Sequence, residues 1–163
     1  MERLHAYWRY EYIEAPKEDK NSQGTIFEDL PKRGDDEANF ILRRTRYCYL
    51  VLNVFPYNAG HLLAIPYRAV CNLEDLTQEE RFDLIELVTF AEGLLRKALK
   101  PEGINVGINL GQAAGAGVPK HLHVHLVPRW NGDTNFMPVI SETRVLPLAL
   151  KDMWKRLKDF IEV

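Results

Sequence analysis

The stretch that decides the fold of this chain is HLHVHLV, residues 121–127. Alternate side chains of a β-strand point to the same face, so the pattern predicts three imidazoles on one face, about 6.5 Å apart at a rise of ~3.3 Å per residue. Leu122, Val124 and Leu126 would lie on the other face, buried against a helix. Three of the chain's five histidines fall within this run, which indicates a functional site more than a solvated strand face.

Three uses of such a face are open. The histidines could be solvated, or they could bind zinc or copper, since neutral imidazole is the commonest metal ligand in proteins. A neutral imidazole can also attack phosphorus and form a covalent phospho-imidazole. No Asp or Glu occurs from Gly103 to Gly132, whereas Lys120 and Arg129 flank the run. This charge favours an anionic ligand, so we expect no metal site.

A glycine-rich loop, GQAAGAG at 111–117, precedes the histidines. Glycine lets backbone amides approach an anion closely, so the loop is a candidate phosphate-binding segment, although an ordinary connection could have the same composition. The loop matches neither G-x-x-x-x-G-K-[ST] nor G-x-G-x-x-G. A P-loop ATPase and a dinucleotide-binding fold therefore have no support.

The segment before this loop predicts a hairpin and then a helix. Residues 47–55 are rich in β-branched and aromatic side chains, residues 56–60 have turn chemistry, and residues 61–65 read as the returning strand. TQEE at 77–80 has the form of a helix-starting capping box, and apolar residues then recur at helical spacing over 84–98.

The remaining elements complete an α+β pattern. Further strands are predicted at 104–110 and 121–127, and a second helix at 148–161. Residues 1–24 read as an aromatic, loop-rich arm, and loop-like composition continues to residue 36. Together these elements predict one domain, 1–163, with an antiparallel sheet and flanking helices.

Composition narrows the class of partner. The formal net charge is −2, from 21 Lys and Arg against 23 Asp and Glu, so a long nucleic acid is not expected, because its binding requires many neutralised phosphates. The two cysteines form no C-x-x-C pair, and no apolar stretch is long enough to cross a membrane. We expect a cytoplasmic protein.

The run at 121–127 resembles the signature of the histidine-triad family, in which three histidines alternate with apolar residues and two more apolar positions follow. Residues 114–137 and 8–13 are similar to the family branch of bacterial diadenosine tetraphosphate phosphorylases. The resemblance implies a five-stranded antiparallel sheet, continued across a homodimer or a larger homo-oligomer. It extends to further positions, namely Asn53, Pro56, Gly60-His61, Pro66, Asn109-Leu110-Gly111, Ala114-Gly115 and Val127-Pro128-Arg129-Trp130.

The same resemblance implies roles for individual residues. His123 would be the nucleophile that takes up AMP, and His121 and His125 would orient it and contact the phosphate. Asn109 and the amides near Gly117 and Val118 would contact the α-phosphate, and Asn53 would bind the ribose hydroxyls. The base would lie against an apolar wall formed by Ile26, Phe27 and Leu63. His61 would support the residues that contact the nucleotide. From the residues alone, the three apolar positions could equally be core, and Asn53 could serve only the hairpin turn.

The chain departs from many relatives at two places. Thr25 and Glu28 stand where those relatives carry the C-x-x-C half of a structural zinc site, so we expect no zinc there. Residues 116–118 replace the Gln and Ser or Thr that often assist the leaving group. Gln112 and Lys120 are then the candidates for that role.

The activity implied is transfer of the AMP part of an adenine dinucleotide, such as diadenosine tetraphosphate, to His123. Phosphate would then release ADP, or water would release AMP. Three alternatives stay open: an adenosine phosphoramidate hydrolase, a nucleotide-binding module with incidental activity, and a metal-dependent hydrolase. No cofactor is expected beyond a divalent cation carried by the nucleotide.

Overall fold

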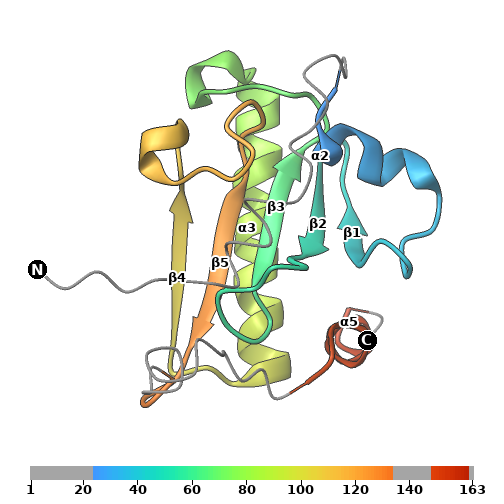
Figure 1. Cartoon of the computed structure of the whole chain (residues 1–163). Coiled ribbons are helices and arrows are strands. Elements are labelled where there is room, and N and C mark those ends of the chain that lie inside the picture. Colours follow the sequence, from blue (N-terminus) through green and yellow to red (C-terminus); the bar gives the residue numbers. More distant parts are fainter. Residues whose placement is uncertain (1–23, 134–147, 162–163) are drawn as a thin grey trace, which may run out of the picture.

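The computed structural model describes residues 24–133 and 148–161. Nearly all of the arm expected at 1–24, and residues 134–137, lie outside these two segments. Figure 1 shows one sheet with a long helix against one face, which confirms the α+β class. No helix in the described segments is long and apolar enough to span a bilayer.

Five antiparallel strands form the sheet in the order β1-β2-β3-β5-β4. This confirms the predicted sheet and the β2–β3 hairpin, and it identifies β1 as the strand that the sequence pattern left unassigned. Continuation of the sheet into a second copy of the chain stays a prediction. The strands are β1 (Ile41–Arg44), β2 (Cys48–Leu52), β3 (Leu62–Pro66), β4 (Gly103–Ile108) and β5 (Val124–Arg129).

Glycine is required in the hairpin turn that leads into β3. Gly60 has a φ of +75°, which favours glycine because it lacks a Cβ. A Cβ at this position would also clash with the side chain of Leu99 at the end of the long helix. The turn and the helix end are therefore in close contact.

The long helix α3 (Gln78–Leu99) covers one face of the sheet. At its start the Thr77 hydroxyl accepts the Glu80 N–H at 3.2 Å, and the Glu80 carboxylate accepts the Thr77 N–H at 2.8 Å. These bonds confirm the predicted capping box. The main core lies between helix and sheet and includes Leu50, Leu52, Leu62, Ala64, Leu84, Leu87, Leu95, Val124 and Leu126.

The opposite face carries a second apolar cluster, which the pocket described below borders. A short helix, α2 (Ile26–Asp29), and a 3-10 helix, Leu30–Arg33, lie in a segment that the sequence predicted to be loop. Strands β2 and β3 are buried along their whole length, because alternate side chains of each strand pack in the main core on one face of the sheet and in the second cluster on the other. The second cluster consists of Phe27, Ile41, Tyr49, Val51, Leu63 and Ile65.

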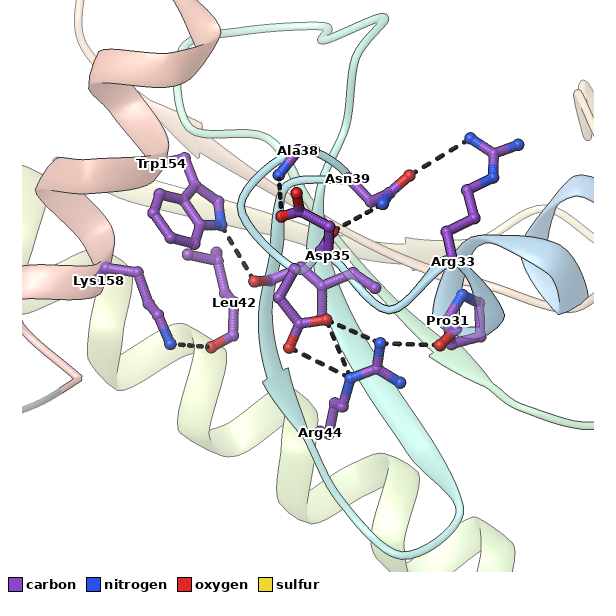
Figure 2. A network of polar contacts seen from close by, with 11 residues as sticks. Pro31, Arg33, Asp35, Ala38, Asn39, Leu42, Arg44, Trp154 and Lys158 are labelled. Carbon is purple, nitrogen blue, oxygen red and sulfur yellow. Dashed lines mark hydrogen bonds and ion pairs between the residues drawn. The ribbon is translucent and has the colours of Figure 1, made fainter.

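Helix α5 (Leu150–Asp159) packs against the β1 edge and is two residues shorter at each end than predicted. Strand β1 shifts its register against β2 at Leu42. Helix α5 supplies donors to the main-chain oxygens at this irregularity. Trp154 Nε1 donates to Ile41 O at 3.0 Å, and Lys158 Nζ donates to Leu42 O at 3.4 Å (Figure 2).

Candidate active site

The histidine run enters the sheet later than predicted. Strand β5 begins one residue after His123, so only His125 of the three is a strand residue. The Leu122 N–H instead donates to Val70 O at 2.7 Å, outside the sheet ladder. The ring centroids of His123 and His125 are 4.8 Å apart with the rings inclined at 63°, closer than the separation of about 6.5 Å expected for alternate residues of a strand.

One hydrogen bond determines which nitrogen of His123 can attack. Its Nδ1 lies 2.8 Å from the main-chain oxygen of His121. A carbonyl oxygen can only accept, so Nδ1 carries the proton and donates it. In the neutral ring the lone pair is then on Nε2. Because His123 lines the pocket described below, this lone pair is available to a bound ligand.

A second set of hydrogen bonds determines the tautomer of His125. The Tyr57 N–H donates to His61 Nδ1 at 3.0 Å, and Asn53 Nδ2 lies 3.2 Å from the same nitrogen. His61 Nδ1 is thus an acceptor, and the proton of the neutral ring is on Nε2. That proton is donated to His125 Nδ1 at 2.9 Å. Neutral His125 therefore carries its own proton on Nε2.

His125 Nε2 is the one buried side-chain nitrogen or oxygen in the described segments that has no hydrogen-bond partner. Buried polar groups are normally paired with protein or water. Since His125 lines the pocket, its Nε2–H is a donor to whatever binds there. An anionic oxygen of a phosphate fits this requirement.

His121 is placed differently from what the resemblance implied. Its ring is fully buried and does not line the pocket. Its Nε2 donates to Pro66 O at 2.7 Å, and its Nδ1 lies 2.6 Å from the Thr25 hydroxyl oxygen. Protein groups thus bond both ring nitrogens, and this placement gives no support to the expected contact between His121 and the phosphate. It orients His123 through its main-chain oxygen.

Burial keeps the two pocket-lining histidines neutral. Desolvation lowers the pKa of His123 below its ordinary value, opposed by the hydrogen bond to His121 O. Desolvation, followed by the charge of His123, lowers the pKa of His125 to about 4. Both rings are consequently unprotonated at pH 7, the state required for one to attack and for the other to accept from His61.

The free energy of unfolding is expected to fall by about 2 kcal/mol between pH 7 and pH 5 through His125 alone. The folded-state pKa of about 4 lies below the unfolded value of ~6.5. Between these two values the unfolded chain binds a proton that the folded chain does not, so stability is full above pH 6.5 and is lost as the pH falls. Urea titrations at both pH values measure the change.

The His125→Asn variant is the matched control for this titration. It removes the titrating ring and is expected to have a flatter dependence of stability on pH over the same window. A variant whose unfolding free energy fell as steeply as that of the wild type would show that another group causes the loss.

The pocket next to these rings has a volume of about 290 Å³. Its lining combines apolar side chains of α2 and of the second cluster with the two histidines. Eight of the residues proposed from the sequence line it, namely Ile26, Phe27, Asn53, Leu63, Gly117, Val118, His123 and His125. Phe27 packs edge-on against His123, with ring centroids 5.1 Å apart.

Sequence reasoning missed several residues of this pocket. Arg33, Asn39 and Phe40 line it but belong to the segment around the unpredicted short helices. Tyr57 also lines it, and its ring is stacked on that of His125 with centroids 5.4 Å apart. Phe55, which the sequence placed at the end of a strand over 47–55, lies beyond the observed strand, is 45% exposed and also lines the pocket.

Other predicted residues lie outside the pocket lining. Asn109 is half-buried, and Gln112 and Lys120 are exposed. Arg129 is ion-paired with Asp133 at 2.6 Å, a carboxylate just beyond the acid-free stretch that the sequence argument used. The positive charge of Arg129 is therefore largely neutralised. The argument for an anionic ligand then depends on the hydrogen-bond donors of the pocket.

This arrangement suits displacement at phosphorus. It combines a neutral imidazole nucleophile, a second imidazole that donates one proton, and the exposed backbone at Gly117 beside the half-buried Val118. In the described segments no three His, Cys, Asp or Glu side chains are grouped around a common metal position. The chemistry that these groups can perform is nucleophilic attack with stabilisation of a developing anion.

Comparison with known proteins agrees with this geometry. The family model for the HIT domain matches residues 35–132, which is more than half of the chain. The AP-4-A phosphorylase of Mycobacterium tuberculosis is 42% identical over 157 residues, covering 93% of this chain and 80% of that protein. The asymmetrical bis(5'-nucleosyl)-tetraphosphatase of Schizosaccharomyces pombe is 39% identical over 93 residues, 57% of this chain and 50% of that protein.

The fold is also found among solved structures. A hypothetical histidine triad nucleotide-binding protein from Sulfolobus tokodaii superposes with a TM-score of 0.69 at 24% identity, covering 85% of this chain and 92% of that one. At this identity the likeness concerns the fold alone. The family match, the long alignment and the placement of the histidines agree: the chain belongs to the HIT domain family.

Proposed function

We propose that this chain cleaves diadenosine tetraphosphate at an α-phosphate and passes the AMP part through His123 to inorganic phosphate. The observation that carries the proposal is the pair of tautomers in the pocket. His123 has its lone pair on Nε2 because Nδ1 donates to His121 O, and His125 has an unpartnered Nε2–H because Nδ1 accepts from His61. A nucleophile and a proton donor thus stand side by side.

The first step forms the bond between His123 Nε2 and the α-phosphorus and breaks the bond to the bridging oxygen, so ATP leaves. The His125 Nε2–H donates to oxygen as negative charge develops there. In the second step a phosphate oxygen attacks the same phosphorus, the P–N bond breaks, and ADP leaves with neutral His123 restored. Each step is a simple displacement.

The remaining pocket residues are suited to hold the nucleoside. Phe27 and Leu63 offer an apolar wall for the base. Asn53 is fixed beside the His61–His125 pair, because its Oδ1 accepts the Phe55 N–H at 3.0 Å and its amide nitrogen lies against His61. A ribose hydroxyl is the group that a polar side chain there would meet.

Phosphorolysis, rather than hydrolysis, is favoured by the relative that aligns over most of the chain, which is an AP-4-A phosphorylase. Water and phosphate would both attack the phosphorus of the adenylyl group on His123. The choice of acceptor therefore rests on similarity of sequence.

Product analysis tests the proposal. Diadenosine tetraphosphate incubated with the protein and inorganic phosphate is expected to give ADP and ATP in equal amounts, with the turnover increasing with phosphate concentration. AMP and ATP in both the presence and absence of phosphate would mean hydrolysis. No cleavage under either condition, together with consumption of an adenosine phosphoramidate, would overturn the proposal in favour of the alternative substrate.

A further inference from the structure

Thr25 makes a buried polar contact that the mechanism above does not use. It is 4% exposed and precedes α2, and its hydroxyl oxygen lies 2.6 Å from His121 Nδ1, 96 residues away in the chain. Since His121 Nε2 already donates its proton to Pro66 O, Nδ1 of the neutral ring holds a lone pair. The Thr25 hydroxyl must therefore be the donor.

The position of Thr25 is itself fixed by the helix that it starts. The Glu28 carboxylate accepts the Thr25 N–H at 2.9 Å, and the Glu28 N–H donates to Thr25 O at 3.0 Å. The Thr25 hydroxyl contacts His121, while the carboxylate and the N–H of Glu28 pair with the main chain of Thr25 at the start of the helix. A side chain without a donor would remove this hydrogen bond from a buried nitrogen of His121, which is costly.

This contact joins the start of α2, which carries Phe27, to His121, which bonds to the nucleophile His123. Helix α2 carries Phe27, which lines the pocket and packs edge-on against both His121 and His123, with ring centroids 5.6 and 5.1 Å apart. The main-chain oxygen of His121 accepts the Nδ1–H of His123. The residue that Thr25 holds is therefore the one that orients the nucleophile.

We propose that Thr25 is a positioning residue for His123. By donating to His121 Nδ1, it fixes the position of Phe27 relative to His123 Nε2. A nucleotide whose base lies against Phe27 then presents its phosphorus to Nε2. The consequence for catalysis rests on the proposed function. The requirement for a hydroxyl donor at position 25 does not, because it follows from the hydrogen bonds of the free protein.

The test compares Thr25→Val, which keeps the shape and removes the donor, with Thr25→Ser, which keeps the donor. In single-turnover reactions with saturating diadenosine tetraphosphate, T25V is expected to adenylylate His123 about 10- to 100-fold more slowly, since misplacing a reacting group by about 1 Å costs on that order. T25S is expected to stay within about threefold of the wild type. Thr89→Val, which loses only an exposed bond from Thr89 to Ile85 O, is the control and is expected to be unchanged.

The ¹⁵N chemical shifts of the imidazole nitrogens give a second test, because a loss of stability alone would not change them in the folded protein. In the wild type and in T25S, His121 is expected to show Nε2–H with a hydrogen-bonded Nδ1, and His123 to show Nδ1–H. In T25V the Nδ1 resonance of His121 is expected to shift towards that of an unbonded nitrogen, and the His123 ring to populate both tautomers. All measurements are made at a temperature at which each variant is fully folded.

Two results would overturn the assignment. One is a folded T25V with wild-type single-turnover rate, and the other is unchanged ¹⁵N resonances of both rings. If T25V does not fold, Thr25→Ala and T25S differ by the hydroxyl alone and give the same comparison. If the wild type itself forms no adenylyl-His123, the proposed function fails, whereas the NMR comparison still decides whether Thr25 positions the two rings.

Discussion

The His123→Asn variant is expected to lose on the order of 10⁴-fold or more in turnover of diadenosine tetraphosphate, since removing the nucleophile of a covalent mechanism has effects of this size. The Asn amide can still donate to His121 O, as Nδ1 of His123 does at 2.8 Å, so the surroundings are preserved. Affinity for AMP is expected to change only a few-fold, because Phe27 and Asn53 remain in the pocket. Steady-state turnover and calorimetric binding of AMP measure the two quantities.

The intact mass of the protein after a rapid, acid-free quench gives a direct check on the same variant. The wild type is expected to gain one adenylyl group in the absence of phosphate, and H123N to gain none. Thr89→Val, at an exposed position of α3 outside the pocket lining, serves as the control and is expected to behave as the wild type. An H123N protein that binds AMP and keeps an appreciable part of the rate would exclude the covalent mechanism.

The second large effect concerns stability. Trp154→Ala is expected to lower the free energy of unfolding by about 3–5 kcal/mol, the usual cost of truncating a buried aromatic side chain. Trp154 is 8% exposed, belongs to the main core, and its Nε1 donates to Ile41 O at 3.0 Å (Figure 2). Its loss leaves both a cavity and an unpaired carbonyl at the point where β1 shifts register. Urea denaturation at one fixed protein concentration measures the change.

Two variants separate the causes of this loss. Trp154→Phe keeps most of the ring and removes the donor, so it is expected to cost about 1–3 kcal/mol, the penalty for an unsatisfied buried acceptor together with a small cavity. Lys155→Ala changes an exposed neighbour on the same helix and is expected to stay within about 0.5 kcal/mol of the wild type. A Trp154→Ala protein as stable as the Lys155 variant would mean that α5 contributes little to the folded chain.

Local patterns explain why much of the architecture could be predicted. The hairpin between β2 and β3 follows from side chains of high strand propensity on either side of a turn, and the start of α3 from the four residues at 77–80. Such signals lie within a few residues of one another. Helix α2 has the same T-x-x-E form at Thr25 to Glu28, but its four helical residues are too few to show a 3.6-residue period, so the segment was predicted to be loop.

The edge strand β1 and the position of His121 could not be predicted for a different reason. The short strand Ile41–Arg44 has no alternating pattern, since its first two residues are buried and its last two exposed, with a register shift between them. His121 read as one of three equivalent strand positions. In the fold Thr25 and Pro66, far away in the sequence, bond its two ring nitrogens and place it outside the pocket lining.

The sequence by itself determined which residue types are available for chemistry and which family the chain resembles. The alternation over 121–127 singled out three histidines, and the family resemblance, not the pattern itself, implied that His123 is the nucleophile among them. Tertiary structure decided what each imidazole can do, because the proton on a ring nitrogen depends on its hydrogen-bond partner. For His125 that partner is His61, 64 residues away, and for His121 it is the main-chain oxygen of Pro66, 55 residues away. Partners at such separations are brought together only by the folded sheet.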